Sequence, residues 1–327
     1  MDFNLNFNMP EKKGEYKVKS MNPDKIYDIL ILGGGPAALT AAVYCMRKGV
    51  KTGLITDNVG GQVAETASVE NYMGFKYIEG MSLVEKFEDQ VKQFEIGFLE
   101  KSPAIKIEGD QEKIVTVKGG VQFKAKAVIV ATGKSPRWLN VPGEEKFKGN
   151  GIAVCATCDA PLYKDKKVIV VGGGNSGVEA AIDLARVSKH VTIIQFLEDF
   201  TADKSLIDNL KTYNNYDVYF NSQVSEIFGD KRIEQVDIEN RKTKNHKIIA
   251  TDGLFVEIGW IPNTDFLKDT LSLNEWNEII VDCQCNTNVP GIFAAGDVTS
   301  VPYKQIIIAA GEGSKAALAA YEYVLKN

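Results

Sequence analysis

The chain has 327 residues, of which 44% are hydrophobic and 25% charged, values that are ordinary for a soluble globular protein of about two domains. The net charge of −5, with no basic run interleaved with aromatic residues, argues against nucleic-acid binding, and no apolar stretch approaches the ~18 residues that a membrane span requires. Five cysteines without framework spacing, and an N-terminus without a signal peptide, fit a reducing compartment. We therefore expect a cytoplasmic, multidomain α/β protein.

The first 25 residues predict an extension rather than a folded element. Asparagine, lysine and glutamate dominate this stretch, and Pro10 and Pro23 interrupt it. Such a composition is typical of a disordered or loosely docked arm. The alternative is that the extension covers part of a cofactor.

A nucleotide-binding pattern begins at residue 27. Residues 27–32 form a continuous apolar run, which is typical of a strand buried on both faces. A glycine-rich segment, residues 33–38, follows at once, then a helical pattern over 39–48 and a second strand over 50–55. In this strand–turn–helix–strand context, the sequence G-x-G-x-x-A predicts dinucleotide binding.

Each small residue of this motif has a separate physical task. Gly33 makes the tight turn, Gly35 lets a pyrophosphate approach the backbone, and Ala38 lets the helix pack closely on the strand. The helix N-terminus then offers its partial positive charge to the phosphates.

Two further strands are expected to end in sharp turns. Residues 127–133 and, near the C-terminus, residues 291–297 both read as an apolar strand that runs into a glycine. Asp297, at the carboxyl end of the second, is well placed to accept hydrogen bonds from the hydroxyl groups of a cofactor.

The segment Cys155-Ala156-Thr157-Cys158-Asp159 carries two thiols three positions apart with a carboxylate directly after them. This spacing lets the sulfurs reach bonding distance, which favours redox chemistry. The alternatives are half of a zinc site or two buried apolar cysteines, and zinc would need a second suitably spaced ligand pair that we do not find. Asp159 predicts an acid/base group for the thiols, with a helix cap or surface charge as the alternative.

The nucleotide-binding pattern then appears a second time. Residues 167–171 predict a buried strand, followed by Gly172, Gly174 and Gly177 at the motif positions and by an alanine-rich helix. Residues 191–194 predict the next strand. Two nucleotide-type folds with a cysteine pair just before the second form a specific combination.

On these motifs the chain resembles the low-molecular-weight thioredoxin reductases from Tyr27 to Lys326. The matching segments are the Gly33 motif, Gly60-Gly61-Gln62, Val69-Glu70-Asn71, Ala131-Thr132-Gly133, residues 155–159, the Gly172 motif, residues 291–297 and Gln305. The resemblance implies an α/β fold of two Rossmann-like, three-layer ββα nucleotide-binding domains. The FAD domain would be discontinuous, formed by residues 26–138 and 264–327, and residues 139–263 would form the inserted domain that carries the redox cysteines.

The resemblance also implies roles for individual residues. Cys158 is the thiol expected against the flavin, Cys155 is the interchange thiol that attacks a thioredoxin-like partner, and Asp159 serves both thiols as acid and base. A homodimer and a rotation of the two domains are implied too. The cofactor-binding positions carried over by motif are Gly33, Gly35, Pro36, Ala37, Ala38, Thr56, Asp57, Gly61, Gln62, Asn71, Ala131, Thr132, Gly133, Gly296, Asp297, Lys304, Gln305 and Ile306.

The second glycine motif departs from the family. NADPH-dependent members follow the strand matching 191–194 with arginines that hold the 2′-phosphate, and here no residue of 195–201 is basic. An NADH site usually has a carboxylate where this chain has Gln195. We therefore expect that NAD(P)H is not used, and the resemblance narrows to the pyridine-nucleotide-independent reductases whose donor is reduced ferredoxin.

Three other functions stay open at this point. The first is an NADPH- or NADH-dependent thioredoxin reductase with an atypical nucleotide site, and the second is an O2-dependent dithiol oxidase. The third is a non-catalytic flavin-binding or redox-sensing protein. No metal site is expected, since Cys283 and Cys285 lack a second ligand pair.

Overall fold

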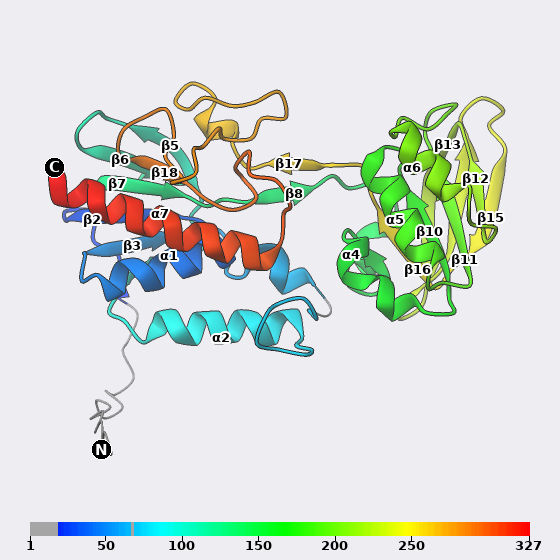
Figure 1. The fold of residues 1–327 in the computed structure, drawn as a ribbon, viewed down its shortest axis with the longest axis horizontal. Coiled ribbons are helices and arrows are strands. Elements are labelled where there is room, and N and C mark those ends of the chain that lie inside the picture. Colours follow the sequence, from blue (N-terminus) through cyan, green and yellow to red (C-terminus); the bar gives the residue numbers. More distant parts are fainter. Residues whose placement is uncertain (1–18, 67–68) are drawn as a thin grey trace, which may run out of the picture. The chain divides into compact units, whose positions relative to one another are not determined.

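The computed structural model describes residues 19–66 and 69–327 (Figure 1). These residues form two compact units. The first contains the described residues up to Gly61, together with Val84–Gly133 and Thr264–Asn327, and the second contains Gln62–Leu83 and Lys134–Asn263. The segment Gln62–Leu83 therefore groups with the second unit, whereas the division expected from the sequence places these residues in the FAD domain.

The first unit is built on an eight-stranded sheet. Five neighbouring strands and the short strand β18 are parallel, whereas β5 and β6 form an antiparallel extension beyond β7. The order is β1 (Lys19–Ser20), β4 (Gly97–Leu99), β3 (Thr52–Ile55), β2 (Ile26–Leu32), β7 (Gln122–Val130), β6 (Lys113–Val117) and β5 (Ala104–Glu108), with β18 (Ile292–Ala294) also on β7.

Two helices, α1 (Pro36–Arg47) and α7 (Ile306–Lys326), lie side by side on one face of this sheet (Figure 1). Small residues allow them to approach closely: a Cβ at Gly313 of α7 would lie 2.1 Å from the carbonyl oxygen of Ala37 in α1. Ile29 and Ile31 of β2 pack under the helices, and Leu30 and Leu32 pack into the core on the opposite face. The continuous apolar run is thus a strand buried on both faces, as predicted.

The second unit has three layers. Its parallel sheet runs β12 (Tyr216–Tyr219), β11 (His190–Ile194), β10 (Lys167–Val171), β16 (Gly253–Val256) and β9 (Ile152–Ala153). On one face lie α5 (Asn175–Ala185) and α6 (Lys204–Leu210), and on the other lies the antiparallel sheet β13 (Ser222–Gly229), β14 (Ile233–Asn240) and β15 (His246–Ala250). Alternate residues of β10 pack into the core beside α5 and α6 and into the core beside the antiparallel sheet. The predicted fold class, two nucleotide-binding-like α/β units, is confirmed.

The remaining elements are short or connect these layers. The helix α2 (Gly80–Lys92) continues from the second unit into the first. The second unit also holds the two-stranded ladder of β8 and β17. The short elements are β8 (Lys134–Pro136), β17 (Trp260–Pro262), α3 (Glu144–Phe147), α4 (Ala156–Asp159), and the 3-10 turns η1 (Gly61–Glu65), η2 (Ala160–Tyr163) and η3 (Asp265–Leu267).

The prediction of a disordered or loosely docked arm is wrong for the last residues of this stretch. Lys19 and Ser20 form β1, which pairs in parallel with β4, and the Lys19 ammonium lies 2.7 Å from the Glu95 carboxylate. Met21 is buried in the core beneath the sheet. Residues 1–18 of the predicted arm lie outside the described residues. None of the helices in the described chain combines the length and apolar character that a bilayer crossing requires.

Candidate active site

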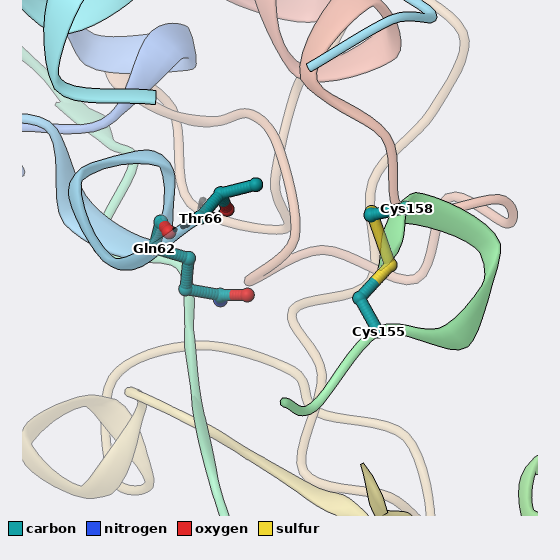
Figure 2. The surroundings of a disulfide bond; sticks show 4 residues. All are labelled: Gln62, Thr66, Cys155 and Cys158. Carbon is teal, nitrogen blue, oxygen red and sulfur yellow. Dashed lines mark hydrogen bonds between the residues drawn. A yellow bond between two sulfur atoms is a disulfide. The ribbon is translucent and has the colours of Figure 1, made fainter. Parts of the chain in front are cut away.

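The two cysteines of the CxxC segment are joined as a disulfide in the second unit (Figure 2). Cys155 has extended backbone and stands at the N-cap position of the single-turn helix α4, which contains Cys158. The N–H groups of Cys158 and Asp159 both donate to the carbonyl oxygen of Cys155, at 3.2 and 3.1 Å. This tight turn sets the two Cα atoms 5.4 Å apart, within the usual range for a disulfide.

Asp159 supplies a buried carboxyl directly after the pair. Its residue is only 8% exposed, and its Oδ1 has no hydrogen-bond partner among the described residues. Burial raises the pKa of this carboxyl to about 6. A carboxyl that titrates near neutral pH can both release and accept a proton during turnover, which is the behaviour expected of an acid/base group.

Glu257 is a second buried carboxyl at this centre, and sequence reasoning missed it. It follows β16 directly, belongs to the same unit as the cysteines, and is only 9% exposed. Burial raises the pKa of Glu257 to about 8. Its only sequence signal is a charged residue at the carboxyl end of an apolar parallel strand, a place where ligands and catalytic groups gather.

The first glycine turn has the geometry of a phosphate cradle. Gly33 adopts φ +130°, and a Cβ there would lie 2.1 Å from the carbonyl oxygen of Ala131, so only glycine fits. Gly35 has open space in front of it, since a Cβ there would meet no atom within 4 Å. Pro36 opens α1 without a side-chain cap from Gly35, which leaves the N–H groups of the first turn facing that space.

Other predicted cofactor positions surround this turn in the first unit. A Cβ at Gly61 would lie 3.5 Å from the Cα of Gly35, and one at Gly296 would lie 2.9 Å from the Cβ of Ala37. The structure places at the carboxyl edge of this sheet, or at the start of α1 or α7, the positions Gly33, Gly35, Pro36, Ala37, Ala38, Thr56, Asp57, Gly61, Ala131, Thr132, Gly133, Gly296, Asp297, Lys304, Gln305 and Ile306.

Gln62 and Asn71 belong instead to the second unit. The Gln62 amide donates to the carbonyl oxygen of Lys134 at 2.6 Å, and Figure 2 shows Gln62 together with Thr66 and the two cysteines. For Gln62 and Asn71, as for the positions in the first unit, cofactor contact stays a prediction.

The second glycine turn keeps the backbone of the first, but its surroundings differ. Gly172 again has φ +130°, and Gly174 has φ −82° and ψ −173°, close to the −80° and −176° of Gly35. Gln195 lies across Gly173: a Cβ there would meet the Gln195 amide nitrogen at 2.7 Å. Both ends of this buried amide are used, since Nε2 donates to the Asp199 carbonyl at 2.9 Å and Oε1 accepts from the Phe196 N–H at 3.0 Å.

Basic residues lie beside the segment 195–201, although that segment itself contains none. The Arg241 guanidinium stacks over the Phe196 ring, 3.4 Å from its centroid, and donates to the Phe196 carbonyl at 3.0 Å. The Lys242 ammonium lies 2.9 Å from the Glu198 carboxylate. Both residues follow β14, more than 40 positions further along the chain, so no local motif could have indicated them.

The remaining cysteines form no comparable centre. Cys283 is exposed, whereas Cys285 is buried and burial raises the pKa of its thiol to about 11. Within the described residues no group of three or more His, Cys, Asp or Glu side chains is arranged to hold a metal ion.

Known proteins share both the sequence and the architecture of this chain. The family model described as pyridine nucleotide-disulphide oxidoreductase matches residues 27–313. The F subunit of the alkyl hydroperoxide reductase of Staphylococcus aureus (strain MSSA476) is 45% identical over 302 residues, which are 92% of this chain and 60% of that protein. A protein named NADH dehydrogenase from Ferdinandcohnia aciditolerans is 44% identical over 301 residues, 92% of this chain and 58% of that protein. The chain thus spans about three fifths of the length of these curated relatives.

Among solved structures, the thioredoxin reductase of Streptococcus pyogenes MGAS5005 superimposes with a TM-score of 0.86 at 36% identity. The match covers 92% of this chain and 99% of that one. The Cys155–Cys158 disulfide and the glycine turns therefore occur in a chain whose two-unit architecture has a counterpart among solved reductases.

Proposed function

The chain belongs to the pyridine nucleotide-disulphide oxidoreductase family, and from that premise we propose that it reduces protein disulfides through the Cys155–Cys158 pair. It is a flavin-dependent disulfide oxidoreductase of the kind its relatives represent. The observation that carries the proposal is the closed disulfide whose next residue, Asp159, is a buried carboxyl with an oxygen that lacks a hydrogen-bond partner among the described residues.

FAD is the cofactor that family membership implies, and the first glycine turn fits it. Gly35 leaves room for a pyrophosphate, and the first turn of α1 directs its N–H groups there. Thr56 and Asp57 follow β3, where a ribose is held in such folds. When bound, FAD supplies the electron pair that reduces the cysteine disulfide.

The thiol chemistry follows from the positions of the residues. After reduction, the Cys155 thiolate attacks one sulfur of the partner disulfide and releases the other as a thiolate. Cys158 then attacks the mixed disulfide, which closes the Cys155–Cys158 bond and frees the second partner thiol. Asp159 takes the proton that a cysteine must lose before attack and returns one to the sulfur that leaves.

We propose a thioredoxin-like protein as the electron acceptor, on the likeness to the Streptococcus pyogenes thioredoxin reductase. The second candidate is a peroxiredoxin-type partner, because the relatives at 45% identity are named as subunits of an alkyl hydroperoxide reductase. Those relatives are longer than this chain, and the match covers 60% of their length. The homodimer implied by the resemblance stays a prediction.

For the donor we propose reduced ferredoxin. The support is Gln195, which stands where an NADH site has its carboxylate and whose amide is already occupied at both ends. An iron–sulfur donor near about −400 mV and a thioredoxin near about −270 mV differ by ~130 mV, which is roughly 6 kcal/mol downhill for two electrons. NADH is the second candidate, favoured by the relative named NADH dehydrogenase and by the intact turn at Gly172.

Anaerobic reduction of the bound flavin tests the donor. We expect reduced ferredoxin to bleach the flavin absorbance within seconds, and NADPH and NADH to leave it unchanged over minutes. Complete bleaching by NADH or NADPH at a comparable rate would overturn the ferredoxin donor but leave the disulfide reductase intact. Rapid oxygen uptake with a small dithiol and no donor would instead support the dithiol oxidase.

A matched pair of glycine variants tests the cofactor site. Gly35→Ala is expected to fold, because its backbone is extended and its Cβ meets no protein atom, yet to lose bound FAD at least about tenfold since the methyl fills the space offered to the pyrophosphate. The control is Gly174→Ala, which has the same backbone and only Thr201 Oγ1 at 3.7 Å. The ratio of flavin to protein absorbance measures the FAD content of both variants. Full flavin content in Gly35→Ala would place the cofactor elsewhere.

A further inference from the structure

Glu312 is a buried carboxyl group of α7 for which the thiol chemistry has no use. The residue is only 4% exposed, and the other buried residues of this helix are alanine, glycine and valine. Burying a carboxyl group costs free energy unless the group is paired or hydrogen-bonded. The partners of Glu312 therefore indicate what the residue is there to hold.

The two carboxyl oxygens of Glu312 have different partners. Oε2 accepts a buried hydrogen bond from the backbone N–H of Gly296 at 3.1 Å. Oε1 lies 3.8 Å from the ammonium of Lys315, three residues further along α7. The same ammonium donates to the carbonyl oxygen of Cys283 at 3.2 Å. Glu312 thus lies between a partly exposed cation and the turn that follows β18.

Gly296 is the point at which the chain leaves the sheet of the first unit. The N–H of Ala295 still donates to the carbonyl oxygen of Val130 in β7, at 3.0 Å. At Gly296 the backbone turns to φ +78°, a value that glycine adopts without strain. The Gly296 carbonyl accepts from the N–H and the hydroxyl of Thr299, at 3.0 and 2.8 Å. With its N–H on Glu312, both backbone groups of Gly296 are used, and the turn is fixed.

This turn lies against the start of α1, where the first glycine turn offers its open space. A Cβ at Gly296 would lie 2.9 Å from the Cβ of Ala37, and Gly35 precedes Ala37 by two residues. Asp297, a predicted cofactor-binding position, follows Gly296 directly. The course of the backbone into Asp297 is therefore set at Gly296.

We propose that Glu312 is a positioning residue for the flavin, whose carboxylate holds the Gly296–Asp297 turn in the shape that binds FAD. The carbonyl groups inside α7 accept hydrogen bonds within the helix, so a side chain has to supply the acceptor. Without that acceptor the buried N–H of Gly296 is left unpaired, which destabilises this form of the turn. Glu312 itself needs no contact with the cofactor. The proposal deepens the proposed function and rests on its flavin site.

Two neutral variants of similar length separate the acceptor from the charge. Glu312→Gln keeps an oxygen for the Gly296 N–H, whereas the thioether of Glu312→Met is at most a weak acceptor. Both lose the charge, and methionine is expected to fold because an apolar side chain suits this buried place. We expect Glu312→Met to release FAD at least about tenfold faster than the wild type, and Glu312→Gln to stay within about threefold of it.

The measurement starts from purified FAD-containing protein. The protein is mixed with an excess of an unrelated apoflavoprotein that captures free FAD, and the activity restored to that apoprotein reports the rate of release. The visible circular dichroism of the bound flavin, which reports the shape of its site, is expected to change in Glu312→Met and to be retained in Glu312→Gln. A Glu312→Met protein that folds but is purified without FAD is the extreme of the same result.

Glu144→Ala is the matched control for a general loss of stability. Glu144 is 3% exposed, lies in the second unit, and accepts the N–H groups of Leu139 and Asn140 at 2.8 and 2.7 Å. Its removal should lower the melting temperature of the protein and leave both the release of FAD and the flavin dichroism unchanged.

Release of FAD from Glu312→Met at the wild-type rate would overturn the proposal. Equal acceleration in Glu312→Gln, or in Glu144→Ala, would do the same, since the acceptor would then not be the cause. None of these measurements uses a donor, a partner or turnover. A protein that holds FAD through Glu312 but reduces no disulfide would refute the proposed function and leave this inference standing, whereas a wild type without FAD would refute both.

Discussion

Replacing Cys158 by serine is expected to stop multiple turnover and to trap the partner protein as a covalent adduct. Cys155 can still attack the partner disulfide, but no second thiol remains to resolve the mixed disulfide. The rate of partner reduction should fall by roughly 10³-fold or more, since one member of a catalytic unit disables the whole unit. A single-turnover assay with a thioredoxin-like protein, followed by non-reducing electrophoresis, measures both the rate and the adduct.

The matched variants make this expectation specific. Cys155→Ser should be equally inactive but form no adduct, because the attacking sulfur is gone. Cys283→Ser, at an exposed thiol of the first unit, should retain wild-type activity and form no adduct. An adduct in Cys155→Ser and none in Cys158→Ser would show that the two roles are exchanged. Full activity in both variants would favour a redox-sensing or flavin-binding protein without dithiol catalysis.

Local patterns in the sequence predict the central strands and glycine turns well, since the signals are short-range. The apolar run before Gly33 is buried on both faces of its sheet, and the φ of +130° at Gly33 and at Gly172 is one that glycine adopts without strain. The CxxC spacing predicts that the sulfurs can meet, and they do.

Long-range contacts explain what the sequence does not reveal. Lys19 and Ser20 look like part of a polar arm, but they pair with β4, whose position in the sheet is not readable from the N-terminus. Arg241 reaches Phe196 from a hairpin far along the chain. Glu257 resembles a solvent-facing charge after a strand, and only the folded structure, in which the residue is 9% exposed, reveals it as buried.

Asp159→Asn is expected to reduce activity strongly while stabilising the oxidised protein. The carboxyl has a pKa of about 6 in the folded chain and 3.8 as its ordinary value, because burial disfavours its charge. The folded protein therefore holds a proton that the unfolded chain has already released, and stability falls as the pH rises from about 4 to about 6. At pH 7 the penalty is about 3 kcal/mol, an upper limit for what the neutral asparagine can recover.

The same substitution removes the proton carrier. Loss of a positioned acid/base group typically lowers a rate by about 10² to 10⁴-fold, and the inflection near pH 6 in kcat/KM should vanish in Asp159→Asn. Asp159→Glu should restore part of the rate and an inflection, which a purely structural role would not require.

Calorimetry at about pH 5 and about pH 7 supplies the second measurement: the wild type should melt at a lower temperature at the higher pH, with a smaller difference in the asparagine variant. An asparagine variant that is less stable than the wild type at neutral pH, or that keeps the inflection, would show that Asp159 is a structural cap rather than the group that moves protons for Cys155 and Cys158.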